Sequence, residues 1–361
     1  MDTSTTFNAI GVLDFDKWLE PKKFSYNPAS MGPLSIEISI DACGICGSDI
    51  HAAAGDWGRA YTPLAVGHEI IGRIVSLGDE VDKSKFHLGD RVGVGPVCDC
   101  CHECNRCKDH KEVNCKKGVL TYLGVDPKTG VKTQGGYADR IRVDSRWVFK
   151  IPDALESKHA APLLCGGITG FKPLLTAKVG KGTKVGIVGI GGIGHMTMLF
   201  AKALGAEVTA ISRSNRKKDD AFELGASDYI ATAEEGYELK NADSLDVLVV
   251  TTSSFSGSNL DKMLTLLKPA GRMIFITAPP MDEKLTVTPM TMLMNDYVIS
   301  GSASGSPHEI EYMLEFAAKH DIKPWVETID ISEPNVAKSW QRMLDGDVKY
   351  RFVLTGYDKC F

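Results

Sequence analysis

Six of the ten cysteines in this 361-residue chain lie within nineteen residues, in the stretch VCDCCHECNRCKDHKEVNC from Val97 to Cys115. Four of the six have the spacing C-x2-C-x2-C-x7-C, namely Cys101, Cys104, Cys107 and Cys115. Two intervening residues let a turn aim both thiolates at one ion, and four thiolates complete a tetrahedral zinc site. Because such a site has no open position, we expect this zinc to be structural.

Two other readings of the cluster are weaker. An iron–sulfur run ends in C-x3-C-P, whereas here the last gap is seven residues and no proline follows Cys115. Incidental free thiols are also disfavoured, because clustered cysteines of a reducing compartment usually bind metal. Cys98 and Cys100 exceed the four ligands, and we interpret them as spectators.

A second set of residues could form a catalytic metal site. Cys46, Ser48, Asp49 and His51 fall within six residues, followed by the pair His68-Glu69 and, much later, by Cys165. Two cysteines and one histidine can bind a zinc ion that keeps one position open for water or substrate. Each residue alone is a weak signal, since a single cysteine or histidine is most often a packing residue.

Two kinds of element must position these residues. Residues 34–45, 70–78, 90–97 and 137–143 are β-branched runs broken by glycine and aspartate, which indicates short strands. Beyond about residue 160, expected strands at 184–190, 206–212, 227–232, 245–252 and 272–278 alternate with helices at 193–206, 216–226 and 259–271. That alternation predicts a parallel, doubly wound sheet. The tail adds helices at 308–320 and 336–346 and strands at 325–331 and 350–354.

Composition narrows the class of protein. The chain has 43% hydrophobic and 24% charged residues and a net charge of −5, which argues against nucleic acid or an anionic membrane as the main partner. No signal peptide and no apolar run of membrane-spanning length is visible. We therefore expect a cytoplasmic protein.

The glycine-rich stretch VGIVGIGGIGH predicts a dinucleotide site. Gly189, Gly191 and Gly194 fit G-x-G-x-x-G, with Gly192 as an extra glycine, and the pattern follows an expected strand and opens an expected helix. The next strand ends in Ser212-Arg213-Ser214, without the acidic residue that binds the ribose of NAD. Arg213, followed by Arg216, Lys217 and Lys218, instead suits the 2′-phosphate of NADP(H). A merely solvated basic patch is disfavoured, because cations oppose the dipole at a helix N-terminus.

The combined motifs resemble a known family. The stretches CGICGSD, GHEIIGRIVSLGDEV, the cysteine cluster, QGGYADRIRV, AAPLLCGGIT and VGIVGIGGIGH are similar to zinc-dependent medium-chain alcohol dehydrogenases, most closely their cinnamyl alcohol dehydrogenase branch and its fungal NADPH-dependent members. The resemblance extends over essentially the whole chain. It implies an α/β fold with a GroES-like, β-rich catalytic domain at 1–160, a Rossmann domain at 161–304 and a C-terminal segment, 305–361, that returns to the catalytic domain.

The resemblance also implies roles for single residues. Cys46, His68 and Cys165 bind the catalytic zinc, Glu69 can replace water as a fourth ligand, Asp49 orients the site, and Ser48 and His51 relay protons. Two zinc ions and NADP(H) are the expected cofactors. The expected cofactor contacts are Thr169, Gly189, Gly191, Gly192, Ile193, Gly194, Ser212, Arg213, Lys217 and Arg351.

Several alternatives stay open at this point. Besides an aldehyde reductase, we considered a polyol dehydrogenase or ketone reductase, a zinc-free quinone reductase, and a non-enzymatic protein that senses NADPH or binds nucleic acid. Trp57 and Tyr297 could line an apolar substrate pocket or simply pack in the core. The resemblance implies a homodimer, joined near residues 297–306, with a small aldehyde or alcohol as substrate.

Overall fold

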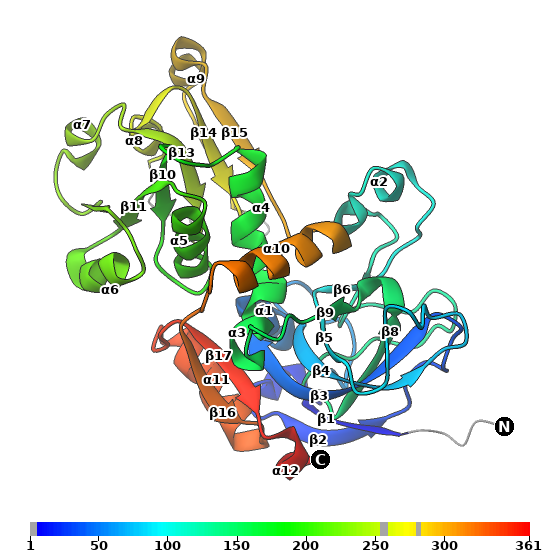
Figure 1. Ribbon diagram of the computed structural model, residues 1–361. Coiled ribbons are helices and arrows are strands. Elements are labelled where there is room, and N and C mark those ends of the chain that lie inside the picture. Colours follow the sequence, from blue (N-terminus) through cyan, green and yellow to red (C-terminus); the bar gives the residue numbers. More distant parts are fainter. Residues whose placement is uncertain (1–5, 253–258, 279–282) are drawn as a thin grey trace. The chain divides into compact units, whose positions relative to one another are not determined.

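The computed structural model describes residues 6–252, 259–278 and 283–361 (Figure 1). The chain divides into two compact units, one formed by Met1–Cys165 and Gly305–Phe361 and the other by Gly166–Ser304. Within the described residues, no helix combines the length and the apolar character needed to cross a membrane.

The first unit is built on a seven-stranded sheet. Its strand order is β16-β17-β3-β4-β5-β9, and β8 also pairs with β3. All pairings are antiparallel except that between β16 and β17. The strands are β3 (Ser35–Ile45), β4 (Glu69–Leu77), β5 (Arg91–Val94), β8 (Arg140–Asp144), β9 (Phe149–Lys150), β16 (Val326–Asp330) and β17 (Arg351–Thr355).

Shorter elements complete this unit. Two small pairs of strands are β1 (Phe7–Gly11) with β2 (Lys22–Tyr26) and β6 (Val97–Asp99) with β7 (Val119–Leu120). The helices are α1 (Gly47–Ala54), α2 (Asn105–Lys108), α3 (Ser157–Pro162), α10 (Pro307–Lys319), α11 (Glu333–Leu344) and α12 (Tyr357–Cys360). The β-rich character agrees with the strands expected from the sequence.

The second unit contains a six-stranded sheet in which every pairing is parallel. Its order, β12-β11-β10-β13-β14-β15, is that of a doubly wound dinucleotide-binding sheet and confirms the predicted α/β fold. The strands are β10 (Lys184–Val188), β11 (Glu207–Ser212), β12 (Asp228–Ala231), β13 (Leu245–Val250), β14 (Leu267–Phe275) and β15 (Val298–Gly301). The helices are α4 (Ile168–Thr176), α5 (Gly194–Ala203), α6 (Lys218–Glu223), α7 (Tyr237–Lys240), α8 (Leu260–Leu264) and α9 (Pro289–Asn295).

One expected helix is shorter than the sequence pattern indicated. The helix predicted over 259–271 ends at Leu264, and β14 begins three residues later, at Leu267. Pro269 cannot donate a backbone hydrogen bond, and Ala270 has a φ of +61°, so a helix cannot continue through this segment. The apolar spacing of the Leu-rich stretch was therefore misleading about where the helix stops.

The C-terminal segment packs onto the N-terminal part of the first unit. Strand β17 pairs with β3, which Figure 1 shows as a late-sequence strand beside an early one. Trp340 of α11 is fully buried, with its ring 6.2 Å from that of Tyr137 and 5.8 Å from that of Trp18. These contacts join segments more than 200 residues apart into one core.

We therefore expect Trp340→Ala to destabilise the first unit by about 3–5 kcal/mol, the usual cost of removing a large buried side chain. Leu344→Ala in the same helix is the matched control, because Leu344 is 52% exposed. Urea unfolding followed by circular dichroism measures both changes. Equal, small losses of stability would show that α11 is not part of the core.

Candidate functional site

Three strand ends meet where the predicted catalytic residues lie. Strand β3 ends at Ile45, directly before Cys46, while its antiparallel neighbours β4 and β17 begin at Glu69 and Arg351. An antiparallel arrangement places the end of one strand beside the beginning of the next. The sheet therefore brings Cys46, Glu69 and Arg351 together, although they lie far apart in the sequence.

The predicted ligands of the catalytic metal converge at this junction. The Sγ atom of Cys46 lies 4.0 Å from that of Cys165, and Nε2 of His68 lies 3.1 Å from Cys165 Sγ. Together with Glu69, their ligand atoms all lie within 4.8 Å of one another. Cys165 is presented by a π-helical turn (Leu163–Gly167) between α3 and α4, a feature common at functional sites.

Two buried side chains orient His68. The carboxylate of Asp49 accepts hydrogen bonds from the backbone N–H groups of Cys46 (2.8 Å) and Gly67 (3.1 Å) and lies 3.3 Å from Nδ1 of His68. The Tyr122 hydroxyl lies 3.1 Å from the same nitrogen. Nε2 of His68 is thereby directed at the metal position, as ligating histidines require. The position of Asp49 fits its predicted role, whereas Tyr122 was not identified from the sequence.

Glu69 is held in a buried ion pair with Arg351, whose guanidinium donates to Oε1. Its other carboxylate oxygen, Oε2, is buried and has no hydrogen-bond partner among the described residues. Gly44 makes room for this oxygen, because a Cβ there would lie 2.0 Å from it. An orphaned carboxylate oxygen beside two thiols and an imidazole is a donor set that fits a zinc ion.

Burial and proximity also shape the acidity of this cluster. The hydrogen bond with Cys165 lowers the pKa of Cys46 well below its usual range, despite burial, and the same bond raises that of Cys165. Burial raises the pKa of Glu69 to about 7, against the lowering effect of Arg351. These are groups that a divalent cation would hold ionised.

The proposed relay residues lie on helix α1. The Ser48 hydroxyl is 3.5 Å from Nε2 of His68, at the metal site. His51, one turn along, places Nδ1 2.8 Å from the carboxylate of Asp56, and its side chain is 41% exposed. Trp57 packs its ring 5.2 Å from that of His51 and remains 38% exposed. Ser48 therefore lies beside the metal site, and His51 lies toward solvent.

The four cysteines of the predicted structural site form a compact cluster. Their Sγ atoms are separated by 3.4 Å (Cys115 to Cys101), 3.8 Å (Cys101 to Cys107), 3.6 Å (Cys104 to Cys107) and 3.9 Å (Cys104 to Cys115). A tetrahedral zinc–thiolate site, with bonds of about 2.3 Å, has sulfur–sulfur edges of about 3.8 Å. Backbone hydrogen bonds from Glu103 and Cys104 lower the pKa of Cys101 to about 6, which favours the ligating thiolate.

The two surplus cysteines differ from each other. Cys98 is buried and hydrogen-bonds to the backbone carbonyls of Val119 and Leu120, each at 3.5 Å. Cys100 instead places Sγ 3.6 Å from that of Cys107, in direct contact with the four-cysteine cluster. Cys98 fits the predicted spectator role, whereas the position of Cys100 does not.

In the second unit, the glycine-rich turn has the geometry of a phosphate cradle. Gly189 has a φ of +96°, a Cβ on Gly194 would lie 1.9 Å from the Gly189 carbonyl oxygen, and a Cβ on Gly191 would meet no atom within 4 Å. Glycine is thus needed for the turn and for helix packing, and the open space beside Gly191 lets a pyrophosphate approach the backbone. Gly192 and Ile193 lie in the same turn, partly exposed, ahead of α5.

The other predicted cofactor residues flank this turn. Ser212 ends β11, and Arg213 follows it as an exposed residue. The Lys217 ammonium donates to the carbonyl of Ile190 at 2.5 Å, which anchors Lys217 beside the glycine-rich turn. Thr169 is buried in α4, a helix that packs against α5 so closely that a Cβ on Gly170 would lie 2.4 Å from Thr197 Oγ1.

Two further predicted residues are buried, and the structure shows their partners. Tyr297 is buried in the core of the second unit and donates to the carbonyl of Leu267 at 3.0 Å, so the core reading holds and the substrate-pocket reading is wrong. Arg351 is the buried partner of Glu69, and its expected contact with the cofactor stays a prediction. The sequence pattern offered no signal for that pairing, because it depends on β17 pairing with β3.

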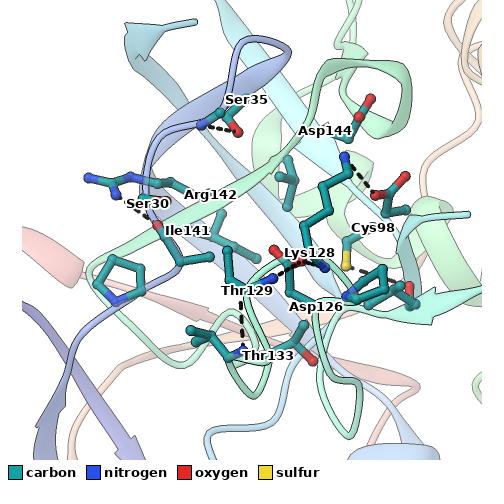
Figure 2. Close-up of a pocket in the computed structure, with 18 of the residues that line it drawn as sticks. Ser30, Ser35, Cys98, Asp126, Lys128, Thr129, Thr133, Ile141, Arg142 and Asp144 are labelled. Atoms are coloured by element: carbon teal, nitrogen blue, oxygen red, sulfur yellow. Dashed lines mark hydrogen bonds and ion pairs between the residues drawn. The ribbon is translucent and has the colours of Figure 1, made fainter.

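A separate cavity of about 430 Å³ lies between residues 26–35 and 126–134 (Figure 2). Three of its charged side chains are engaged with neighbours: Lys128 lies 3.7 Å from Asp99, Arg142 2.7 Å from Glu37, and Asp144 2.6 Å from Arg146. Of the described residues that line it, none belongs to the predicted metal or proton-relay sets. The predicted metal and proton-relay residues therefore lie outside this cavity.

The metal assignment predicts two zinc ions per chain. Cys104→Ser should release one zinc and lower the unfolding temperature, because structural zinc contributes folding free energy. Cys165→Ala should lose the other zinc while the protein stays folded. Cys98→Ser, a buried cysteine outside both sets, is the control and should keep both ions. Elemental analysis with thermal unfolding measures this, and full zinc content in Cys104→Ser would contradict the assignment.

Comparison with known proteins shows the family to which the chain belongs. The model of the alcohol dehydrogenase GroES-like domain matches residues 32–153, and that of the zinc-binding dehydrogenases matches residues 192–319. The NADP-dependent alcohol dehydrogenase 6 of Saccharomyces cerevisiae is 45% identical over 356 residues, 98% of each chain.

Solved structures show the same similarity. A cinnamyl alcohol dehydrogenase from Sorghum bicolor is 33% identical, with a TM-score of 0.92 over 99% of both chains. A cinnamyl alcohol dehydrogenase from Helicobacter pylori, complexed with NADP(H), is 31% identical, with a TM-score of 0.90 over 99% of both chains. The resemblance seen in the sequence is confirmed, and this chain belongs to the zinc-binding alcohol dehydrogenase family.

Proposed function

We propose that this protein interconverts aldehydes and primary alcohols with NADP(H). The observation that carries the proposal is the convergence of Cys46, His68 and Cys165 beside the Ser48 hydroxyl. The 45%-identical relative named as an NADP-dependent alcohol dehydrogenase supports it. A protein that only senses NADPH or binds nucleic acid would have no use for this assembly.

When bound, zinc at Cys46, His68 and Cys165 supplies a Lewis acid for the carbonyl oxygen, and NADPH supplies the hydride. Ser48 holds a proton on Oγ at the metal site and transfers it to the oxygen of the reduced product. His51, oriented by Asp56 and open to solvent, returns a proton from bulk water. Asp49 and Tyr122 keep the His68 ring fixed while this happens.

The choice of NADPH follows from the end of β11. Arg213 and Lys217 are the cations that would meet a 2′-phosphate, with the Ser212 hydroxyl as a further donor. None of the residues from Ser212 to Lys218 is acidic, so an adenosine ribose with a free 2′-hydroxyl gains little there.

The substrate class is proposed to be bulky or aromatic aldehydes, such as cinnamaldehyde, together with medium-chain aliphatic ones. Trp57, half-exposed beside His51, gives an apolar surface at the relay. Absorbance at 340 nm with NADPH and a panel of aldehydes, ketones and polyols tests the class. Oxidation of polyols with no aldehyde reduction would favour a polyol dehydrogenase, and no consumption of NADPH would favour a binding protein.

The proposed assembly is a homodimer joined at the edge of the second unit's sheet. Strand β15 has a single neighbour, β14, and Val298 on it is 40% exposed. Helix α9, directly before β15, exposes Leu293 and Met294 to 70% each. An open strand edge beside exposed apolar residues is suited to pairing with a second copy. The proposed compartment is the cytoplasm, which fits ten cysteines that are all free thiols.

Ser48→Ala should reduce the rate of aldehyde reduction by about 10²- to 10⁴-fold, the usual contribution of an aligned proton donor. Ser48→Thr keeps the hydroxyl and should retain most activity, and both variants should bind zinc normally. Stopped-flow measurement of the hydride-transfer step separates chemistry from product release. An unchanged single-turnover rate in Ser48→Ala would refute the role of this hydroxyl.

Arg213→Ala should erode the NADPH preference, because charge-assisted hydrogen bonds contribute roughly 1.5–3 kcal/mol each. Two such bonds correspond to a preference of at least about a hundredfold in kcat/KM for the unmodified protein. The variant should lose activity with NADPH and keep its activity with NADH. Lys181→Ala, an equal charge change before the start of β10, is the control. Equal use of both cofactors by the unmodified enzyme would contradict this reading.

Sedimentation equilibrium should give about twice the 39.1 kDa chain mass. The double substitution Leu293→Asp/Met294→Asp should shift the protein toward monomer, because two carboxylates cannot be buried in an apolar interface without a large desolvation cost. Leu239→Asp is the control, since Leu239 is 74% exposed on α7 of the same unit. A monomeric unmodified protein would overturn the proposed assembly.

A further inference from the structure

Cys100 is a fifth thiol at a site that needs four. Its Sγ lies 3.6 Å from Cys107 Sγ, a separation equal to that between the ligand sulfurs of Cys104 and Cys107. The two sulfurs are therefore in direct contact. Cys101, Cys104, Cys107 and Cys115 already form a closed set, so Cys100 touches a ligand without being one.

A histidine side chain lies beside the Cys100 thiol. Both ring nitrogens of His102 lie near its Sγ, Nδ1 at 3.5 Å and Nε2 at 3.6 Å. The Asp99 carboxylate holds this ring through a 2.9 Å contact with Nε2. The imidazole is therefore placed to accept the proton that the Cys100 sulfur gives up when it is oxidised.

The geometry points to Cys100 and Cys107 as a redox pair, in which a hydroperoxide converts the two sulfurs into a disulfide and removes Cys107 from the structural zinc site. Contacting cysteines, one of them able to resolve an oxidised partner, are the recurring form of such sites. The inference depends on zinc at the four-cysteine site and is independent of the proposed dehydrogenase activity.

The reaction has two steps. In the first, the Cys100 sulfur attacks the peroxide, the O–O bond breaks, Cys100 becomes a sulfenic acid, and the leaving hydroxide takes the original thiol proton, by way of His102, to form water. In the second, the Cys107 thiolate attacks that sulfur, the S–S bond forms and the S–O bond breaks, and the departing hydroxide takes a proton from solvent. Two electrons pass from the two sulfurs to hydrogen peroxide, which becomes two molecules of water.

Loss of Cys107 leaves three sulfur ligands for the zinc. A three-thiolate set no longer closes the tetrahedron, so the ion becomes exchangeable and the segment between β6 and β7 loses its main constraint. Reduction of the disulfide by a dithiol would restore the fourth ligand. The site would therefore couple zinc retention to the oxidant level.

The test treats the zinc-loaded protein with hydrogen peroxide and follows released zinc with a chromogenic chelator. Cys100→Ala should slow the release by at least about threefold, because the oxidant must then attack sulfurs whose lone pairs bind the metal. Peptide mapping of the unmodified protein, quenched by alkylation, should find Cys100 linked to Cys107. Dithiothreitol with added zinc should restore the original metal content.

Cys98→Ala is the matched control, since Cys98 is as buried as Cys100 but contacts backbone carbonyls, as Figure 2 shows. It should release zinc at the unmodified rate. Cys100→Ser tests whether a packing defect explains the result for Cys100→Ala, because serine nearly preserves the size of the side chain. It should release zinc as slowly as Cys100→Ala. Release at the unmodified rate in both Cys100 variants, or disulfides found only among the four ligands, would overturn the inference.

Discussion

The ion pair between Glu69 and Arg351 is the interaction on which the catalytic site depends. Both side chains are buried, and a charge removed from water is tolerated only where opposite charge and hydrogen bonds surround it. When Cys46 and Cys165 are ionised, their two thiolates and the Glu69 carboxylate carry three negative charges. The Arg351 guanidinium balances one of them, so two negative charges remain. A divalent cation supplies that balance, and Glu69 Oε2, buried without a hydrogen-bond partner among the described residues, faces the place where it would bind.

The same chain uses cysteine in two different ways. At the strand junction, the two cysteines and the histidine come from separate elements, and a carboxylate and a hydroxyl lie beside them, which fits a metal site with an open fourth position. In the segment from Cys101 to Cys115, four thiols from one loop close around each other, which suits stability rather than catalysis. Spacing along the sequence distinguishes the two uses, because a closed site forms locally and an open one requires the fold.

The sequence accordingly predicted local features well and long-range pairings poorly. Short stretches of sequence are enough to recognise the cysteine spacing, the glycine-rich turn and the basic end of β11. Tyr122 could not be assigned, because it reaches His68 from a segment without a recognisable pattern. The pairing of Arg351 with Glu69 depends on the antiparallel register of β3 with both of its neighbours. The burial of Tyr297 depends on how the second unit packs. Helix α8 ended early because backbone geometry at Pro269 and Ala270 overrode an apolar pattern.

The most direct test of the central claim is crystallography of the protein purified with zinc, using anomalous scattering at the zinc absorption edge. The account predicts one peak between Cys46, His68 and Cys165, with zinc–sulfur distances of about 2.3 Å and a zinc–nitrogen distance of about 2.0–2.1 Å. A second peak should lie at the centre of Cys101, Cys104, Cys107 and Cys115. A zinc peak at the four cysteines alone, in crystals of protein that reduces aldehydes, would contradict the assignment of the strand junction as the catalytic site.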